Sequence, residues 1–302
     1  MARRGAYGGW LKYYTATSNG FRIKDFDLRH TIESAQPLTF HADYNLAEGT
    51  LEYAAGDKVI RAVCLGNSKE CTVRLHSNDM AFAKKEFAKR FALNDDMERI
   101  YARISTDQFV VSAIERYHGM RVTMNDPWET TLCFIMSQYN NVKRIRLIIK
   151  RFVSEFGPEI LDGDGKTVGK GFPSSGDLIG RTEADFRGCG AGFRAKYIKS
   201  AADYCTNNLD LYKLHNKSYD KIKEELMRIS GVGDKVADCI ALMGYGKMEA
   251  FPIDVWVKRT LEGVYFDGKK KKIGDLHRFA EERWRPYAGY AQQYIFHGAR
   301  NM

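Results

Sequence analysis

The chain of 302 residues carries a formal net charge of +9, and 44% of its residues are hydrophobic. This length and apolar content indicate a globular protein of one large domain or two ordinary ones, and the excess positive charge favours a polyanionic partner, either nucleic acid or an anionic membrane surface. No apolar run approaches the roughly 20 residues that span a bilayer, and no apolar signal core follows the first residues, so we expect a soluble, intracellular protein without membrane association.

The cysteine pattern argues against a metal or a cluster. Six cysteines stand at positions 64, 71, 133, 189, 205 and 239, and no two of them form a CxxC pair. Neither a zinc ribbon nor a Cys-ligated iron–sulfur cluster fits this spacing. We therefore expect reduced, isolated cysteines in a protein that uses no metal and no cofactor.

The first quarter of the chain has the pattern of a small antiparallel sheet. Residues 1–20 show no clear period, and no element is predicted there. From Phe21 to about Ser77 the pattern has a period of two, with turn signals at 56–57 and 66–68. The alternating positions are Leu51, Tyr53 and Ala55, then Val59, Arg61 and Val63, then Val73 and Leu75.

Helical periods dominate after Asp79, which can cap a helix. Helices are predicted near 79–92, 94–105, 107–118, 127–138, 142–156, 194–206, 218–229, 234–243, 273–283 and 288–298. The glycine-rich stretch 161–173 is predicted to be a loop, and it lacks the GxxxxGK[ST] spacing of a P-loop. Four lysines at 269–272 fit either a solvated turn or sequence-independent phosphate contacts.

This order of elements predicts an α+β fold. We expect an N-terminal antiparallel β-sheet domain with flanking helices over residues 1–115. A larger all-helical domain is expected to follow over residues 116–302.

Two short amphipathic helices flank a tight break at residues 230–233. The residues Gly231, Val232 and Gly233 form the break, and its glycines allow a sharp turn whose backbone N–H groups stay free beside the positive end of the second helix. The segment is therefore predicted to be a helix-hairpin-helix that binds a phosphate. Apolar residues recur at helical spacing on both sides of it, at Ile222, Leu226, Ile229, Val236, Ile240 and Met243.

Two polar residues near the hairpin are candidates for chemistry. Lys235 lies in the first turn of the second helix, where the helix dipole disfavours the protonated amine, and a neutral lysine is a nucleophile. Asp254 follows 19 positions later (254 − 235), and its carboxylate can stabilise positive charge that develops on a sugar. Taken singly, Lys235 fits a surface residue and Asp254 a helix cap. Together with the hairpin they favour a catalytic site.

The stretch from Met227 to Trp256 resembles the helix-hairpin-helix/Gly-Pro-Asp superfamily of DNA glycosylases, and it is most similar to the 8-oxoguanine DNA glycosylases. The likeness extends from about Phe21 to Phe296 and is strongest after Asp126. It implies a base-excision repair enzyme with glycosylase and AP lyase activities. Its implied partner is double-stranded DNA that contains a damaged base, 8-oxoguanine opposite cytosine, bound by a monomer.

The resemblance also assigns catalytic roles. It implies that Lys235 attacks C1′ of the damaged nucleotide, expels the base and forms a Schiff base that undergoes β-elimination. It implies that Asp254 orients and stabilises the charged sugar. Alkylbase glycosylases of the superfamily keep the aspartate and lack the lysine, so Lys235 is the residue that discriminates between the two activities.

Residues 126–144 resemble the family's minor-groove element. Tyr139 stands where the family has an asparagine that fills the gap left by the flipped base, so we expect the tyrosine to fill that gap by stacking. By the same resemblance Arg144 and Arg194 read the opposite cytosine, and their donors suit its acceptors. Asn140 and Asn141 match the family, and Phe193 stands at the place of an aromatic wedge.

The last predicted helix resembles the family's base pocket. Gln292 is expected to read the Watson–Crick edge of the extruded base, and Phe296 is expected to stack on it, since the two share a helix face. Cys239 and Met243 are expected on the other side of the pocket.

The chain departs from the family at two further positions. Ala35 replaces a glycine whose carbonyl accepts the N7 hydrogen of 8-oxoguanine. We expect the alanine methyl group to narrow the approach and its backbone to require ordinary φ and ψ. Trp256 replaces a histidine that contacts phosphate, so we expect the phosphate contact there to differ, with the indole N–H as the donor.

Two other interpretations stay open. A monofunctional glycosylase for alkylated bases would form no covalent adduct in the presence of borohydride. A non-catalytic module that uses the hairpin for phosphate alone would leave damaged duplex intact and would still bind it in a salt-sensitive manner.

Overall fold

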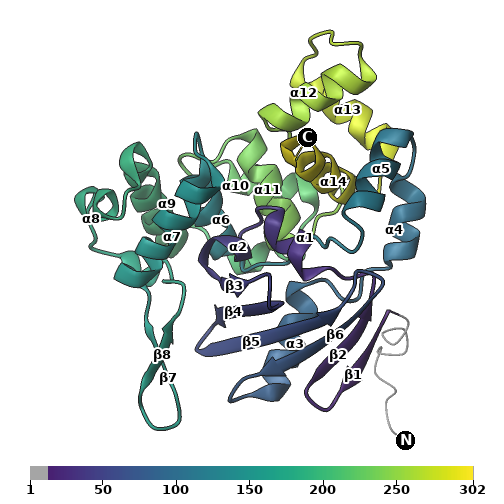
Figure 1. Cartoon of the computed structure of the whole chain (residues 1–302). Coiled ribbons are helices and arrows are strands. Elements are labelled where there is room, and N and C mark those ends of the chain that lie inside the picture. Colours follow the sequence, from purple (N-terminus) through teal and green to yellow (C-terminus); the bar gives the residue numbers. More distant parts are fainter. Residues whose placement is uncertain (1–12, 302) are drawn as a thin grey trace, which may run out of the picture.

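The computed structural model describes residues 13–301, which form a six-stranded antiparallel sheet below a larger body of helices (Figure 1). The predicted α+β order is confirmed. Neighbouring strands pair in the order β1-β2-β6-β5-β4-β3. The strands are β1 (Tyr14–Thr17), β2 (Gly20–Lys24), β3 (Asp43–Asn45), β4 (Thr50–Ala55), β5 (Lys58–Gly66) and β6 (Glu70–His76).

The helices run through the rest of the described chain. They are α1 (Leu28–Glu33), α2 (Leu38–His41), α3 (Met80–Arg90), α4 (Met97–Ile104), α5 (Gln108–Arg116), α6 (Pro127–Ser137), α7 (Val142–Phe156), α8 (Glu183–Gly188), α9 (Ala195–Asn207), α10 (Tyr219–Leu226), α11 (Asp234–Tyr245), α12 (Val255–Tyr265), α13 (Ile273–Trp284) and α14 (Ala288–Asn301). Short 3₁₀ turns lie at η1 (Gly176–Leu178), η2 (Gly192–Arg194) and η3 (Leu211–Leu214). The ten helices predicted from periodicity are present, and their ends differ from the prediction by at most three residues.

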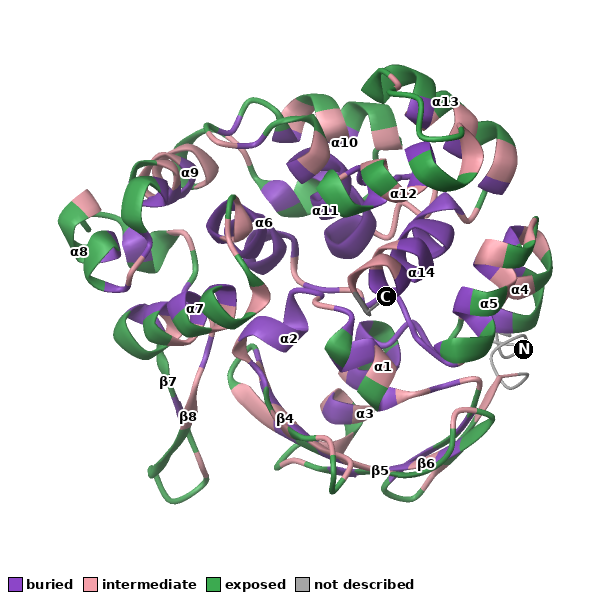
Figure 2. Ribbon diagram, turned by 45° about the horizontal axis from the view of Figure 1, so that its top comes forward, coloured by how far each residue is buried: buried purple, intermediate pink, exposed green. Residues whose placement is uncertain are grey.

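One face of the sheet is buried, because alternate residues of a strand point to opposite sides. That face packs against α1 and α3, which lie between the sheet and the other helices in Figure 2. In β5 the buried residues are Ile60 and Ala62, while Arg61 is exposed. The prediction therefore placed this strand correctly, but the alternating set it chose (Val59, Arg61, Val63) belongs to the outer face.

Two regions differ from the prediction. The edge strand β1 lies within the first twenty residues, where no element was predicted, and residues 1–12 lie outside the described part. The glycine-rich stretch is not a plain loop, because β7 (Glu159–Leu161) and β8 (Thr167–Lys170) pair as a hairpin, so the second part of the chain is not all-helical. Residues Val168 and Leu161 of this hairpin are exposed and Ile160 is buried, so its apolar residues do not mark a single core-facing side.

The buried apolar residues form two clusters. One contains the sheet, α1 and α3, and the other contains the helices from α4 onward. Met97, Ile104 and Val110 belong to the second cluster, and α4 and α5 contact α14. Packing thus favours a division near residue 95, and the division at residue 115 stays a prediction.

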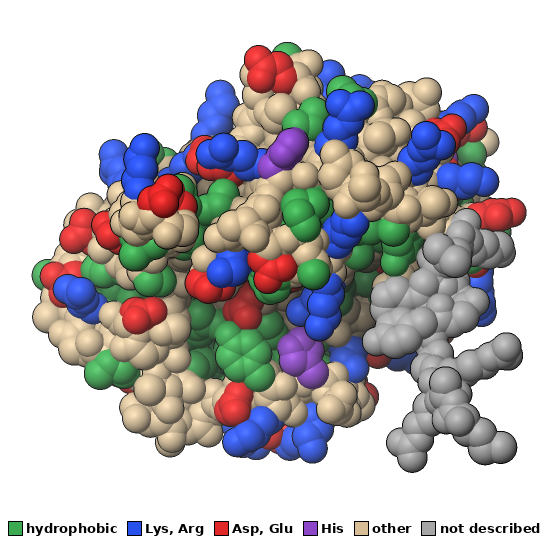
Figure 3. Space-filling model, turned by 90° about the horizontal axis from the view of Figure 1, so that it is seen from below, with side chains coloured by type: hydrophobic (Ala, Val, Ile, Leu, Met, Phe, Trp, Pro, Cys, Tyr) green, Lys and Arg blue, Asp and Glu red, His purple; other side chains and the backbone are tan. Residues whose placement is uncertain are grey.

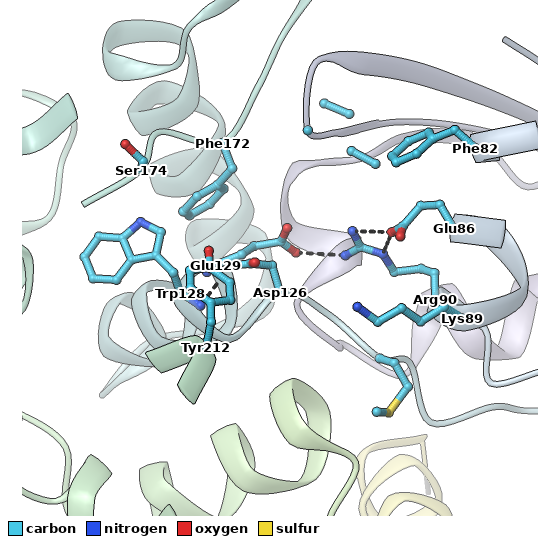
Figure 4. A pocket seen from close by; sticks show the side chains of 14 residues that line it. Phe82, Glu86, Lys89, Arg90, Asp126, Trp128, Glu129, Phe172, Ser174 and Tyr212 are labelled. Carbon is cyan, nitrogen blue, oxygen red and sulfur yellow. Dashed lines mark hydrogen bonds and ion pairs between the residues drawn. The ribbon is translucent and has the colours of Figure 1, made fainter. Parts of the chain in front are cut away.

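A buried ionic group joins the two parts. Glu129 of α6 accepts a hydrogen bond from Arg90 of α3 (3.2 Å), and its Oε1 lies 2.9 Å from Nε2 of His41. Arg90 also forms an ion pair with Glu86. Figure 4 shows Glu86, Arg90 and Glu129 at the wall of a hollow of about 270 Å³ between the sheet part and the helices. Although burial raises the pKa of Glu129, the charges of His41 and Arg90 lower it to about 2.

Surface charge is mixed on the face seen from below the sheet. Lys and Arg side chains alternate there with Asp and Glu, and apolar side chains line the hollowed centre (Figure 3). The net charge of +9 is therefore not gathered on that face. Among the described residues, no helix is long and apolar enough to cross a membrane.

Candidate active site

The predicted helix-hairpin-helix is present, with α10 and α11 on either side of the turn. Gly231 has φ +87°, and a Cβ there would lie 2.6 Å from the ring of Tyr197, so glycine is required on both counts. Gly233 is extended (φ −94°, ψ −177°), and a Cβ there would meet nothing within 4 Å. The turn conformation therefore requires glycine only at position 231, whereas the prediction assigned this role to both glycines. Val232, which lies between them, is buried.

Lys235 and Asp254 line the same hollow, which has a volume of about 540 Å³. The half-buried Lys235 is the second residue of α11, and its Nζ lies 5.3 Å from the ring centroid of Phe134. Asp254 is the N-cap of α12 and accepts a hydrogen bond from the backbone N–H of Val257 at 2.8 Å. The cap uses one carboxylate oxygen, so the predicted cap is confirmed and the catalytic role of Asp254 stays a prediction.

Five further predicted residues line this hollow. They come from the α1–α2 turn, the α6–α7 turn, α12 and α14, which are distant in sequence, and they are Ala35, Asn140, Asn141, Trp256 and Phe296. The fold thus brings together residues that the resemblance assigned to base binding, DNA contact and catalysis.

Three residues predicted for the base pocket are buried and are not among the residues that line the hollow: Cys239, Met243 and Gln292. Burial raises the pKa of the Cys239 thiol to about 11, although the neighbouring Lys235 lowers it. The Oε1 atom of Gln292 is buried without a hydrogen-bond partner among the described residues. An unpaired buried acceptor costs free energy, and a ligand donor that reached it would remove that cost.

Ala35 has a left-handed backbone (φ +60°), so the expectation of ordinary φ and ψ was wrong. The residue follows Ser34, the C-cap of α1, at the position where helices commonly adopt this conformation. Neighbouring side chains fix the turn, since Gln293 donates to the carbonyl of Ser34 at 2.8 Å and Gln36 donates to the carbonyl of Arg121 at 2.7 Å.

We expect Ala35→Gly to stabilise the fold by about 0.5–1 kcal/mol, because relief of the left-handed strain exceeds the added entropy of the unfolded chain. Denaturant unfolding measures the change. Ala191→Gly is the matched control: Ala191 is buried with φ −62°, and glycine there should destabilise by about 1 kcal/mol. A loss of stability in Ala35→Gly would contradict the assigned strain.

A second, shallower hollow adjoins the first. It is lined by Tyr139, Asn140, Asn141, Arg144, Gly192, Phe193 and Arg194, and the two asparagines line both hollows. Tyr139 is 93% exposed with φ +49°, and its ring centroid lies 6.2 Å from that of Phe193. A fully exposed aromatic residue in a strained conformation is typical of a functional position.

Arg194 differs from Arg144 in its environment. Its buried guanidinium donates to the carbonyls of Gln138 (2.7 Å), Tyr139 (3.1 Å) and Ala191 (3.3 Å), whereas Arg144 is exposed. Burial lowers the pKa of Arg194, and the charge of Arg144 adds to this effect. The structure thus presents Arg144 to a ligand and uses Arg194 to hold the turn that carries Tyr139.

Residues that the sequence reasoning missed also line the first hollow, among them Phe134 and Arg300. Arg300 follows Phe296 by four positions on α14, as Phe296 follows Gln292. This spacing places the three residues on one helix face and could have indicated Arg300 from the sequence. Phe134 lies within the apolar run 132–136 of α6, which carries no such signal.

One group of metal-type ligands occurs among the described residues, formed by Asp234, Asp238 and His277. The Lys223 ammonium forms ion pairs with Asp234 (2.8 Å) and Asp238 (2.7 Å). A protein cation thus already neutralises these carboxylates. One of the lysines at 269–272 also forms an ion pair within the protein, since Nζ of Lys270 lies 3.0 Å from a carboxylate oxygen of Glu262.

Comparisons with known proteins agree with this geometry. A family model described as "HhH-GPD superfamily base excision DNA repair protein" matches residues 132–286. A probable N-glycosylase/DNA lyase of Methanothermobacter thermautotrophicus is 30% identical over 230 residues, which cover 70% of this chain and 72% of that protein.

Two solved structures are similar over nearly the whole chain. MBOgg1 in complex with a low-affinity DNA ligand has a TM-score of 0.85 and 30% identity, with coverage of 96% of this chain and 99% of that chain. The 8-oxoguanine glycosylase/lyase of Clostridium acetobutylicum, in complex with DNA containing cytosine opposite to 8-oxoguanine, has a TM-score of 0.83 and 28% identity, with coverage of 95% and 97%.

Proposed function

Because this chain belongs to the HhH-GPD superfamily of base excision DNA repair proteins, we propose that it is a DNA N-glycosylase and AP lyase that removes 8-oxoguanine paired with cytosine from duplex DNA. The observation that carries the proposal is the hollow shared by Lys235 and Asp254. The similarity to a glycosylase/lyase bound to DNA with this base pair supports the substrate. The protein would act as a monomer in an intracellular compartment that contains DNA.

In the proposed reaction the neutral amine of Lys235 attacks C1′ of the flipped nucleotide. The base leaves with the electron pair of the glycosidic bond and acquires a proton, and the carboxylate of Asp254 stabilises the positive charge that develops on the sugar. Ring opening then gives a Schiff base between Nζ and C1′. Loss of a proton from C2′ expels the 3′ phosphate by β-elimination.

The surrounding residues would bind the nucleotide and fill its place in the duplex. The proposal assigns Gln292 to the Watson–Crick edge of the base, where its unpaired Oε1 can accept a hydrogen bond, and Phe296 to stacking. Tyr139 and Phe193 would fill the gap that the flipped nucleotide leaves in the DNA duplex. The backbone carbonyl of Ala35 would accept the hydrogen on N7.

Borohydride trapping tests the proposed function. A duplex with 8-oxoguanine opposite cytosine should give a covalent protein–DNA complex, and an undamaged duplex should give none, with uracil and alkylated purines as further comparison substrates. Base release without trapping would favour the monofunctional alkylbase enzyme. Binding of damaged duplex that stays intact would favour the non-catalytic module.

The two arginines of the second hollow are expected to have different functions, Arg144 in reading the base opposite the lesion and Arg194 in stabilising the fold. Arg144→Ala is expected to leave unfolding within about 0.5 kcal/mol of wild type and to reduce the preference for cytosine over adenine opposite the lesion about tenfold, because an exposed donor to the base is lost. Arg194→Ala is expected to destabilise the fold by about 2 kcal/mol, because three carbonyls lose their donor. Thermal unfolding and kcat/KM on the two duplexes measure both effects, and an unchanged preference in Arg144→Ala would contradict its role.

A further inference from the structure

Arg300 is a half-buried cation that has no ion-pair partner among the described residues. It lies in the last turn of α14, its guanidinium carbon is 5.2 Å from the ring centroid of Phe296, and its Nη1 is buried without a hydrogen bond to any described residue. The ion pairs among the described residues do not include it. A buried guanidinium N–H without an acceptor costs free energy, and an incoming anion can offset that cost.

The surroundings of Arg300 are electropositive. Burial, together with the charges of His30, Arg300 and Arg116, lowers the pKa of the neighbouring His297 to about 4. Burial also lowers the pKa of Arg300 itself, while the charge of Asp254 opposes that change. Asp254 already caps α12 and forms no ion pair with Arg300. The carboxylate of Asp254 thus offsets part of this positive charge without forming an ion pair with Arg300.

The position of Arg300 fits the backbone side of a bound nucleotide. Gln292, Phe296 and Arg300 follow one another at intervals of four along a single face of α14, and burial decreases from Gln292 outward. At a rise of about 1.5 Å per residue, Arg300 lies roughly 6 Å beyond Phe296 and roughly 12 Å beyond Gln292. A base held between Gln292 and Phe296 thus places its sugar and phosphates toward Arg300.

Trp256 lines the same hollow and supplies less charge to an anion than an arginine does. Trp256, 45% exposed in the first turn of α12, has a single neutral N–H donor. Arginine offers several donors in a planar fork that matches phosphate oxygens. The Phe296 ring beneath the guanidinium restricts its orientation.

We propose that Arg300 binds a non-bridging oxygen of a phosphodiester that adjoins the flipped nucleotide, and that this contact positions C1′ opposite Lys235. The inference rests on the proposed function, because it requires a nucleotide in the hollow. It adds a substrate-binding residue and the chemical group that this residue recognises.

Equilibrium binding to an uncleavable duplex tests the contact. The duplex carries a tetrahydrofuran abasic analogue opposite cytosine, and a neutral methylphosphonate replaces one phosphate at a time on either side of the analogue. In wild type, one of these replacements should weaken binding about tenfold, as expected for a lost charge-assisted hydrogen bond. Arg300→Gln should weaken binding to the unmodified duplex about tenfold and should be insensitive to that same replacement.

Salt dependence gives an independent readout. The slope of log Kd against log salt concentration should fall by about 0.9 in Arg300→Gln, because one phosphate contact is lost. Arg300→Lys should keep the slope and part of the affinity. Lys166→Gln, an exposed cation between β7 and β8, is the matched control and should keep the methylphosphonate effect in full.

Two results would overturn the inference. If Arg300→Gln binds the unmodified duplex as tightly as the wild type does, Arg300 makes no contact with the bound nucleotide. If the variant retains the full methylphosphonate effect, another group makes the contact. Thermal unfolding of each variant checks folding, and Arg300→Met, which also removes the charge, carries the test if Arg300→Gln does not fold. Failure of the proposed function is separate, because it appears as an absence of borohydride trapping by the wild-type protein on 8-oxoguanine duplex.

Discussion

Lys235→Gln is expected to abolish the borohydride-trapped adduct and to lower the excision of 8-oxoguanine at least about a thousandfold. The physical reason is that an amide nitrogen has no basic lone pair with which to attack C1′ or form a Schiff base. The side chain is half-buried and contacts the ring of Phe134, so its replacement should change the free energy of unfolding by less than about 1 kcal/mol. The loss is therefore expected in chemistry and not in folding.

Single-turnover excision and trapping on the same duplex measure this effect. Lys247→Gln is the matched control, because Lys247 lies just beyond the other end of α11 and the chemical change is identical. Wild-type activity is expected there. Excision at an unreduced rate by Lys235→Gln, without an adduct, would exclude the lysine as nucleophile and favour the alkylbase interpretation.

Glu129→Ala is expected to destabilise the protein by about 3 kcal/mol at neutral pH, because it leaves the buried Arg90 and His41 without their shared carboxylate. The fall of the Glu129 pKa from 4.5 to about 2 predicts the same magnitude. Since the pKa is depressed in the folded state, this contribution is present in full above the unfolded pKa near 4.5. It is lost as the pH falls toward 2.

Denaturant unfolding between pH 2 and pH 7 measures this dependence. The difference between wild type and Glu129→Gln should be largest above about pH 5 and should shrink toward pH 2, since glutamine keeps the shape and cannot titrate. Glu155→Ala, an exposed carboxylate on α7, serves as the control and should follow the wild-type profile. A constant difference across this range would show that charge at Glu129 does not stabilise the fold.

Periodicity predicted the helices well because an apolar stripe repeats over several turns. The prediction was weaker in the sheet, because apolar residues lie on both faces of β5. Val59 and Val63 are on the outer face and Ile60 and Ala62 are buried, so the pattern alone could not show which set faces the core. The β7–β8 hairpin escaped prediction because it extends from the body of the protein and presents residues such as Val168 to solvent.

The site was predicted through resemblance, and its environment could not be read from the sequence. Nothing in the sequence around Arg194 indicates that its guanidinium donates to carbonyls 55 and 56 positions away. The left-handed backbone of Ala35 follows from the end of α1 and from contacts with distant segments. Arg300 shares a helix face with Phe296, yet its unpaired state depends on which side chains the fold leaves nearby.

Gln138 connects the turn that carries Tyr139 to the helix-hairpin-helix that carries Lys235. Its side-chain amide donates to the carbonyl of Gly231 at 2.8 Å, and its own carbonyl accepts from Arg194 at 2.7 Å. These hydrogen bonds hold the turn that carries Tyr139 and the hairpin that carries Lys235 in a fixed arrangement. The conformational entropy of the two segments is therefore lost on folding and not on binding. The DNA duplex must then deform to fit this rigid protein surface. A base pair that is already weakened deforms with less free energy than an intact one, and selectivity can begin at that step, before any atom of the base is read.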